Sequence, residues 1–306
     1  MSRYVMIRVV QGLVALIIAT IVIFGLARLT GDPLDVMLPE EATEAEYEAM
    51  RKYLGLDKPL PVQYWVFISK AAQGDFGRSF LSRRPVMDII TERVPATFKL
   101  AGAAILISLL ISLPVGILAA VKREKWQDQI AKGFAILGQA TPAFWLGIML
   151  ILVFGVKLNW LPAGGYRGIE SWILPAATMS TFSTAGILRL TRSSMLDTLS
   201  SDYVRLARIK GISERLVIWK HALRNALIPV ITFGGVIYTH MLMGSVITET
   251  VFAWPGIGRL SYEAVMFRDF PLMQGLIMIF VAVYLVANLG IDILYVYLDP
   301  RVRYVK

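Results

Sequence analysis

The sequence predicts an all-α integral membrane protein. Three features of its 306 residues indicate this class: 56% of the residues are hydrophobic, the mean hydropathy is +0.62, and the charged residues, only 17% of the chain, are clustered between long apolar runs. Soluble domains rarely combine these values. The absence of cysteine excludes disulfides, thiolate metal sites and cysteine nucleophiles, and two histidines are too few for a histidine metal cluster. The residues therefore assign no catalytic group and no metal site.

Six apolar runs are long enough to cross a bilayer as helices, because a span needs about 20 residues. They cover residues 9–29, 97–121, 133–156, 172–190, 230–249 and 272–297. The fourth is the weakest, since it is short and rich in Ser and Thr. The first follows Arg3 and Arg8 as a signal peptide would, but it is longer than a usual apolar signal core and no small-residue cleavage site follows it. We expect it to be kept as a helix.

The distribution of Lys and Arg sets the orientation of the predicted spans. Two bases precede the first span, four follow the second, eight lie between residues 189 and 224, and three end the chain, whereas the opposite short loops hold two each. Both termini are therefore expected in the cytoplasm. The whole chain has a net charge of +9. Residues 31–96 carry eleven acids and eight bases, a net charge of −3, so the remaining residues together carry +12. Membrane orientation explains this excess, and no nucleic-acid partner is predicted.

The segment after the first span has the signals of a folded, helical insertion. Thr43 with Glu46 three residues later forms a capping box before a helix that Gly55 can end. A second helix is expected from Pro61, which a first helical turn allows, to about Gly74. The residues leave two roles open for this segment: a solvated lid, or a dock for a partner.

The basic stretch at residues 202–229 is organised in a way that a simple loop is not. Gly211 divides it, because glycine is costly within a helix but permits backbone angles that other residues avoid. Ser213 is a plausible N-cap, and Pro229 suits the first turn of the fifth span. Apolar residues then recur at helical spacing: Ile212, Leu216, Trp219, Leu223 and Leu227. We expect two short helices joined at a bend.

Three explanations fit this stretch at the level of its residues. A loop that obeys the charge bias accounts for the cations but not for the apolar stripe or the bend. An amphipathic helix on anionic lipid accounts for both helices but gives glycine no role. A docking element would fit a groove on a cytoplasmic partner, with apolar anchors at i, i+4 and i+7.

Four stretches resemble the permease subunits of binding-protein-dependent ABC importers, in the branch that carries dipeptides, oligopeptides and nickel. They are ARIKGISERLVIWKHALRNALIPVIT (207–232), GDFGRSF (74–80), FAWPGIGRL (252–260) and DILYVYLDPRVRY (292–304). The family's coupling loop is usually described by Glu-Ala-Ala and a glycine four positions later. Here those positions are Arg205, Leu206, Ala207 and Gly211, so only Ala207 and Gly211 match, and no carboxylate role can be assigned at Arg205.

The resemblance implies a type I ABC importer permease fold with six transmembrane helices and a helical extracytoplasmic insertion between the first two. It divides the chain into an N-terminal tail with the first span (1–30), the extracytoplasmic segment (31–94), the transmembrane domain (95–297) and a cytoplasmic tail (298–306). The cytoplasmic coupling loop (191–229) lies within the transmembrane domain. The resemblance places the protein in the bacterial cytoplasmic (inner) membrane as a multi-pass protein.

The resemblance also implies partners: a second homologous permease, two ATPase subunits, an extracytoplasmic substrate-binding protein and membrane lipid. No phosphate-binding G-x-x-x-x-G-K-[ST] motif occurs, so ATP and Mg are expected on the ATPases and no cofactor on this chain. The implied coupling residues are Arg205, Leu206, Ala207, Arg208, Ile209 and Gly211. The transported substrate is expected to be peptide-like and to move inward by alternating access.

Polar residues inside apolar runs are candidates for the translocation pathway, because they are costly there. These candidates are Gln139, Thr141, His240, Glu249 and Asn288. Two other functional classes compete with the importer permease. A stand-alone secondary transporter or channel needs its own coupling-ion site, and the spans show no cluster of acids. A membrane enzyme needs a catalytic set at membrane depth, and His240 has no evident partner for one.

Overall fold

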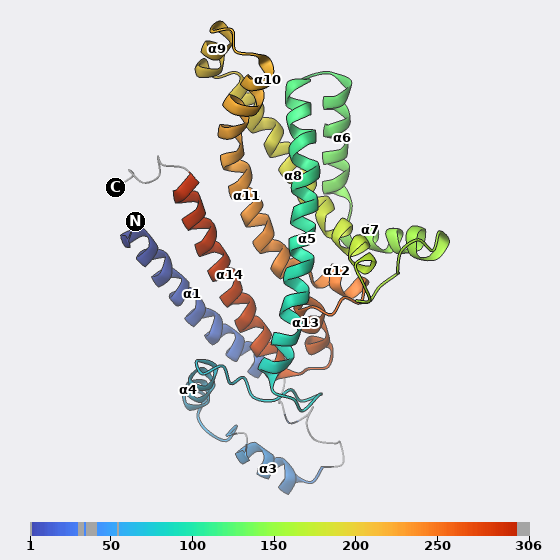
Figure 1. The fold of residues 1–306 in the computed structure, drawn as a ribbon. Helices are drawn as coiled ribbons and strands as arrows, with labels where there is room; N and C mark the ends of the chain where they lie inside the picture. The colour runs from blue at the N-terminus through green and yellow to red at the C-terminus, as the bar shows by residue number, and fades with distance from the viewer. Residues whose placement is uncertain (1, 30–33, 35–41, 54, 299–306) are drawn as a thin grey trace. The chain divides into compact units, whose positions relative to one another are not determined.

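The computed structural model describes residues 2–29, 34, 42–53 and 55–298. These residues are helical apart from loops and one isolated antiparallel bridge between Arg78 and Pro85 (Figure 1). The prediction of an all-α protein is confirmed for this part of the chain.

The chain divides into two compact units. One combines Met1–Pro95 with Gly256–Leu289, and the other combines Ala96–Pro255 with Gly290–Lys306. Two long helices continue from one unit into the other: α5 (Val86–Val121) and α14 (Phe270–Leu298). The first unit also holds α1 (Ser2–Leu29), α3 (Glu44–Tyr53), α4 (Leu60–Ala71) and α13 (Ile257–Met266).

The core of the first unit joins the start of α5 to α13 and the start of α14. Apolar contact between these helices removes side chains from solvent, the main driving force for their packing. A Cβ at Gly275 would lie 2.6 Å from Val86 Cγ1, so a glycine is needed where α14 meets α5. The buried members of this core are Val86, Ile89, Ile90, Ile257, Leu260, Ala264, Leu272 and Leu276.

The predicted capping box of the insertion is confirmed. The Thr43 backbone N–H donates to Glu46 Oε2 at 2.8 Å, and the Glu46 N–H donates to Thr43 Oγ1 at 3.4 Å. The hydrogen bonds from the backbone and hydroxyl of Thr43 lower the pKa of the Glu46 carboxyl. Gly55 adopts a φ of +66° after α3, as a helix-ending glycine does. The second expected helix is α4, with Pro61 in its first turn.

One buried carboxylate organises the turn at the end of the GDFGRSF motif. Asp269 accepts hydrogen bonds from Ser79 Oγ at 2.5 Å and from the backbone N–H groups of Phe80 and Leu81 at 3.1 and 3.3 Å. It also accepts one from the Leu272 N–H at 3.3 Å, at the start of α14. A buried carboxylate needs such donors. The motif therefore has a structural role within the first unit.

The second unit is built around α8 (Glu170–Leu199), which packs on α6 (Trp126–Ala140) and α11 (Leu223–Gly244). Small residues allow the close approach: a Cβ at Gly138 of α6 would lie 3.1 Å from Ala185 Cβ of α8. Many of the hydroxyl side chains of α8 are buried and donate to carbonyls of their own helix. Such residues are Thr178, Ser180, Ser183 and Thr191.

By length and composition, four helices qualify as membrane spans: Met6–Leu26, Val86–Val121, Glu214–Met243 and Phe270–Leu294. A fifth span results if α6 is counted together with α7 (Ala143–Leu150) and the π-helical turn η1 (Ile151–Lys157), which follow it after a bend of 101°. α8 is not among these, because a helix covered by protein on several sides can carry many hydroxyls. The six-span count therefore stays a prediction.

Several expected helix boundaries were wrong. The second helix begins at Val86 instead of residue 97, and the fourth ends at Leu199 instead of residue 190. The third apolar helix begins at Trp126 instead of residue 133, and it breaks at Pro142. The fifth begins at Glu214 instead of residue 230. Pro229 consequently lies inside α11, not in the first turn of a new span. Membrane helices tolerate such a proline because neighbouring groups satisfy the carbonyl that it leaves free.

The predicted apolar stripe after Gly211 is only partly on the buried face, where Ile212 and Leu223 pack in apolar clusters. Leu216 and Trp219 are both more than half exposed, whereas the buried positions are Val217, Ala222 and Ala226. A π-helical turn, η2 (Val217–Ala222), follows α10 (Glu214–Leu216) and adds a residue to one turn, so the positions after it shift relative to the stripe. A strict 3.6-residue period cannot follow the buried face across that insertion.

Candidate coupling helix and pathway residues

The predicted bend at Gly211 is confirmed and follows a Schellman motif. The helix before it is α9 (Asp202–Ile209). The Gly211 N–H donates to the Arg208 carbonyl at 2.9 Å, and the Ile212 N–H donates to the Ala207 carbonyl at 3.2 Å. Gly211 has a φ of +76°, and a Cβ there would meet no atom within 4 Å. The position therefore requires glycine for its backbone angle and not for space.

The charges of α9 suit its dipole: Asp202 lies in its first turn and Arg208 in its last. Its backbone N-cap is Ser201, whose hydroxyl donates instead to the Thr198 carbonyl at 2.5 Å. Ser213, the predicted cap of the next helix, likewise makes no side-chain capping bond.

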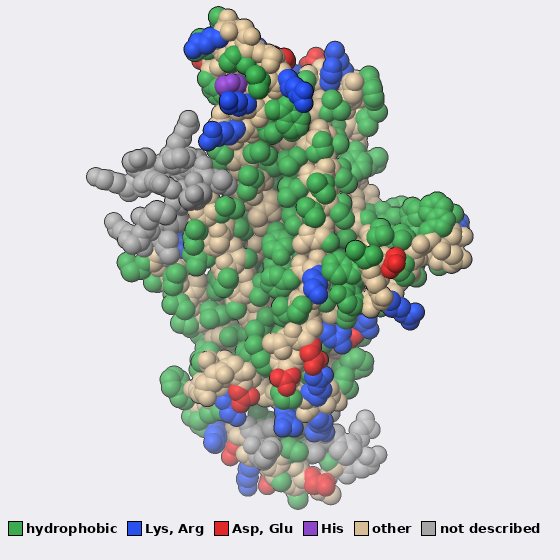
Figure 2. Space-filling view, viewed as in Figure 1, with side chains coloured by type: hydrophobic (Ala, Val, Ile, Leu, Met, Phe, Trp, Pro, Cys, Tyr) green, Lys and Arg blue, Asp and Glu red, His purple; other side chains and the backbone are tan. Residues whose placement is uncertain are grey.

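The two faces of α9 differ sharply in burial. Val204 and Ala207 are buried and pack with Val217 and Ile212 in a small apolar cluster. On the other side, Leu206 is 51% and Ile209 81% exposed. An exposed leucine is ordinary, but two large apolar side chains on one short helix within a basic surface suggest a docking face. Figure 2 shows the Lys and Arg side chains gathered around α9 and α10.

Arg208 joins the two arms of the bend. Its Nε and Nη2 atoms donate to Glu214 Oε2 and Oε1 at 3.1 and 2.7 Å, a bidentate pair. A weaker bond at 3.4 Å runs from Nη1 to the Leu199 carbonyl. Arg205 lies differently: its guanidinium is exposed, with Asp202 Oδ1 at 3.6 Å. The two arginines of the predicted coupling set thus have separate environments, one within the bend and one on its outer face.

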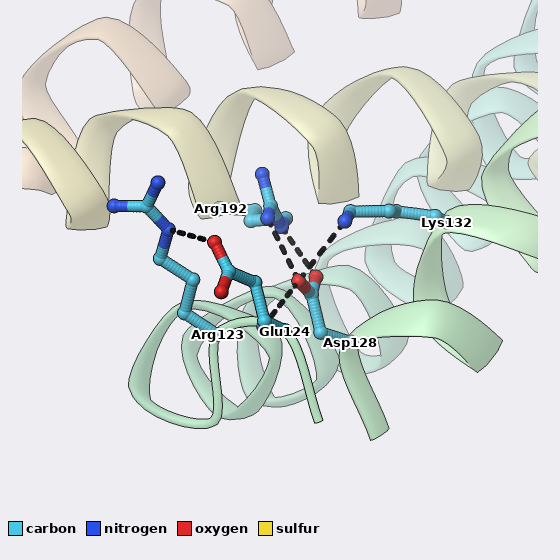
Figure 3. Close-up of polar contacts among 5 residues, drawn as sticks. All are labelled: Arg123, Glu124, Asp128, Lys132 and Arg192. Atoms are coloured by element: carbon cyan, nitrogen blue, oxygen red, sulfur yellow. Dashed lines mark hydrogen bonds and ion pairs between the residues drawn. The ribbon is translucent and has the colours of Figure 1, made fainter. Parts of the chain in front are cut away.

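A second polar site of this unit lies where α6 begins, and the sequence analysis missed it. Asp128 is fully buried, and both of its carboxylate oxygens are bonded. Arg192 of α8 donates from Nε to Oδ1 at 2.5 Å and from Nη2 to Oδ2 at 2.8 Å. The Lys132 ammonium lies 3.1 Å from Oδ2, and the Glu124 backbone N–H donates to that oxygen at 3.0 Å (Figure 3).

Asp128 therefore fastens α6 to the half of α8 that leads into α9. In the sequence it lies in a run of charges that the orientation rule already explains, so nothing separates it from solvated neighbours such as Arg123 and Glu124. Those two pair with each other at the surface at 3.3 Å. The only available signal was an acid four residues before Lys132, which a helix brings to the same face.

The five candidate pathway residues occupy different environments. Gln139 and Thr141 lie at the break between α6 and α7, where the Thr141 hydroxyl donates to the Leu137 carbonyl at 2.7 Å. His240 is exposed on α11, and Asn288 is half-buried on α14. Glu249 lies in the short helix α12 (Val246–Val251) and is fully buried. Their transport roles stay predictions.

Glu249 belongs to a buried polar and aromatic cluster in the second unit. Thr97 of α5 donates its hydroxyl to Glu249 Oε1 at 2.6 Å. The Trp254 backbone N–H donates to the Glu249 carbonyl at 2.8 Å, and the Trp254 indole donates to the Ala96 carbonyl at 3.0 Å. The carboxylate thus ties α12 to α5, which a solvated rim position would not do. The sequence predicts that Asp292 pairs with Arg301 or Arg303, but both arginines lie outside the described residues.

Comparison with known proteins decides the family. Residues 112–304 match the family described as binding-protein-dependent transport system inner membrane component, and residues 1–101 match its N-terminal membrane component. The chain belongs to this family. The permease is 42% identical to the glutathione transport system permease protein GsiC of Escherichia coli K12 over 99% of this chain and 100% of the relative. The same values hold for GsiC of Shigella dysenteriae.

Solved structures agree on the fold. The permease resembles a chain of the inward-facing MetNI methionine ABC transporter with a TM-score of 0.58 and 15% identity, over 70% of this chain and 97% of the other. An amino acid ABC transporter solved with histidines gives a TM-score of 0.52 and 18% identity, over 70% and 94%. At such identities the likeness shows the fold alone. The type I importer permease fold is thus confirmed.

Family and fold together establish the functional class. The protein is an ABC importer permease of the inner membrane, with several apolar helices, and not a stand-alone transporter or channel. The family is one of transport subunits, so no catalytic role is required of any residue described above.

Proposed function

We propose that this permease pairs with a second, homologous permease and docks α9 into one of two ATPase subunits. The observation that carries this proposal is the outer face of α9, where Leu206 and Ile209 are exposed beside Arg205. Apolar anchors one turn apart, flanked by a cation, suit a groove on a protein partner. Ala207 supports the helix from its buried side, and Arg208 holds the bend through Glu214.

ATP and Mg are bound by the ATPases, and no cofactor is bound by this chain. Closure of the two ATPases on ATP moves α9 as a lever, and α9 continues from α8 after two residues. Because Asp128 fastens α6 to α8 through Arg192, α6 follows this movement as far as its break at Pro142. Alternating access is then a rigid-body rearrangement. Gln139 and Thr141 at the break, with His240, Glu249 and Asn288, are the proposed pathway residues.

The substrate is proposed to be a peptide-like molecule, with small peptides such as glutathione foremost, and an extracytoplasmic binding protein delivers it. The support is the full-length similarity to permeases of glutathione transport systems. The bias of Lys and Arg supports cytoplasmic termini in a bacterial inner membrane. Residues 31–94 are then extracytoplasmic, residues 95–297 form the transmembrane domain, and residues 191–229 form the coupling loop.

A matched pair of leucines tests the docking proposal. Leu206 and Leu216 are each 51% exposed, one on either side of the bend. Leu206→Ser should reduce recovery of the ATPases when the tagged permease is purified in mild detergent from its own membranes, and it should reduce uptake into vesicles. Leu216→Ser should leave both near the wild-type level. Equal recovery of the ATPases with both variants, or a larger loss with Leu216→Ser, would place the docking face elsewhere.

A further inference from the structure

We propose that α4 is an in-plane membrane helix, whose outward face lies in the lipid interface at the C-terminal end of α1. Both helices belong to the first unit, and they contact each other (Figure 1). The residues alone left two roles open for this segment, a solvated lid or a dock for a partner. The proposal rests on contacts with a candidate span and on the character of the face turned away from it.

The inner face of α4 is fixed to α1 by a hydrogen bond and two aromatic contacts. Tyr64 Oη lies 2.8 Å from Thr20 Oγ1, and the Thr20 hydroxyl is also 2.7 Å from the Ile17 carbonyl. The Phe24 ring stands edge-on to Tyr64 at 5.5 Å between centroids and contacts Phe67 at 6.0 Å. Thr20 is fully buried, although α1 is otherwise largely exposed. A polar residue within a span needs such a partner.

These contacts place α4 at membrane depth. Thr20 and Phe24 lie within the apolar run of α1, eight and four residues before Arg28, the first charged residue after that run. With about 1.5 Å of rise per residue, they lie about 12 Å and about 6 Å along the helix from Arg28. A helix in contact with both residues therefore lies at the depth of about 5–10 Å that amphipathic interfacial helices reach.

The outward face of α4 suits lipid. Val62, Trp65 and Val66 are exposed there, Trp65 at 70%. Ser69, the polar member of this face, donates its hydroxyl to the Trp65 carbonyl at 2.7 Å, so its donor is satisfied within the helix. Tryptophan is enriched at the membrane interface because its ring is apolar and its N–H is polar.

Exposed charges flank α4. Asp57 and Lys58 precede the helix and Lys70 lies in its last turn, so both lysine ammonium groups can reach lipid phosphates. A water-soluble protein partner fits this face less well, because the opposite face of α4 is held against residues of α1 that lie within a candidate membrane span. The exposed apolar face of α1 beside it, for example Ile17 and Ile21, belongs to a candidate membrane span and therefore suits lipid as well.

The lack of native cysteine allows a direct test. Trp65→Cys in the full-length permease carries a nitroxide, and the protein is reconstituted in vesicles of phosphatidylethanolamine and phosphatidylglycerol. Collision of the label with oxygen, which concentrates in lipid, is compared with collision with a water-soluble nickel chelate. Two control positions set the scale: Ile18→Cys on the exposed face of α1, and Glu48→Cys on the exposed face of α3.

The Trp65→Cys label should collide several-fold more with oxygen than with the nickel chelate, as Ile18→Cys does and Glu48→Cys does not. A pattern like that of Glu48→Cys would show a water-facing helix and overturn the proposal. A label shielded from both reagents would show a protein-covered face and overturn it as well. If Trp65→Cys fails to accumulate, Val62→Cys and Val66→Cys decide by the same comparison, because they share that face.

Discussion

Gly211 is the residue whose backbone angle decides the shape of the coupling loop. At φ +76°, a side chain with a Cβ costs about 1–2 kcal/mol, and a β-branched one more. We expect Gly211→Val to keep membrane insertion but to lower uptake per ATP hydrolysed, measured in vesicles with the assembled importer. The matched control is Gly102→Val, where a Cβ also meets nothing within 4 Å but the glycine lies in α5 with helical angles. Unchanged coupling in Gly211→Val would show that the bend is dispensable.

The ion pair of Asp128 and Arg192 is a second residue-scale device, and a double-mutant cycle measures it. Removing one partner of a buried pair leaves the other charge without compensation, which costs about 3 kcal/mol. Asp128→Asn and Arg192→Gln should each lower the Tm of the purified permease by several degrees, and the double variant should be much less than additive. The exposed pair Asp202 and Arg205 is the control, for which the same cycle should give almost no coupling. Additive effects at Asp128 and Arg192 would contradict the pairing.

Individual residues were predictable where a backbone rule applies to them. Gly211, Gly55 and the box of Thr43 with Glu46 are local signals, and the structure has all of them as expected. Asp128 was not predictable, because its partner Arg192 lies 64 residues away and burial is decided by packing. Glu249 was noted as a polar residue of an apolar run, yet its partner Thr97 is 152 residues away. Sequence reasoning identifies the polar residue in such cases but not its partner.

At the scale of elements, the close contact between α6 and α8 predicts different effects of alanine at two glycines of α6. A Cβ at Gly138 would lie 3.1 Å from Ala185 Cβ and 3.3 Å from the Thr181 carbonyl oxygen, whereas a Cβ at Gly133 of the same helix meets nothing within 4 Å. Gly138→Ala should therefore lower the Tm, since overpacking costs about 1–3 kcal/mol. Gly133→Ala should leave the Tm unchanged or raise it, because alanine is the better helix former by about 1 kcal/mol. Equal shifts for both would mean that the contact is not tight in the membrane.

Elements were predicted well where hydropathy alone decides and less well where packing or a register change intervenes. α1 and α14 are apolar along their length, and their expected positions agree with the structure. The break at Pro142 could be predicted from the proline, which cannot donate the backbone hydrogen bond of a continuous helix. The shift of the apolar stripe after Gly211 could not be predicted, because no residue of η2 indicates a π-helical turn. α8 was the weakest expected span for the same physical reason that makes it central: its small hydroxyl residues are suited to helix contacts, not to lipid.

At the scale of the whole molecule, exposed apolar surface is what a permease without its partners should present. Ile209 and Leu206 on α9 are such positions, and so are Trp145 of α7 and Val156 of η1. The sequence could indicate the class of the missing partners only through its resemblance to the family. The composition predicted a membrane protein, and the distribution of Lys and Arg predicted its orientation. Neither could separate an importer subunit from a transporter that works alone.

The predicted orientation can be tested on the whole molecule, because a chain without cysteine accepts single reporter thiols. Glu48→Cys on α3 and Lys210→Cys after α9 are both exposed, so a thiol reagent can reach either one if it is on the right side of the membrane. In intact spheroplasts, a membrane-impermeant maleimide should label Glu48→Cys at once and Lys210→Cys only after permeabilisation. The bias of Lys and Arg between the short loops is the physical cause. Labelling of Lys210→Cys from outside would invert the topology and remove α9 from the reach of any cytoplasmic ATPase. This measurement can therefore overturn the docking proposal together with the predicted orientation.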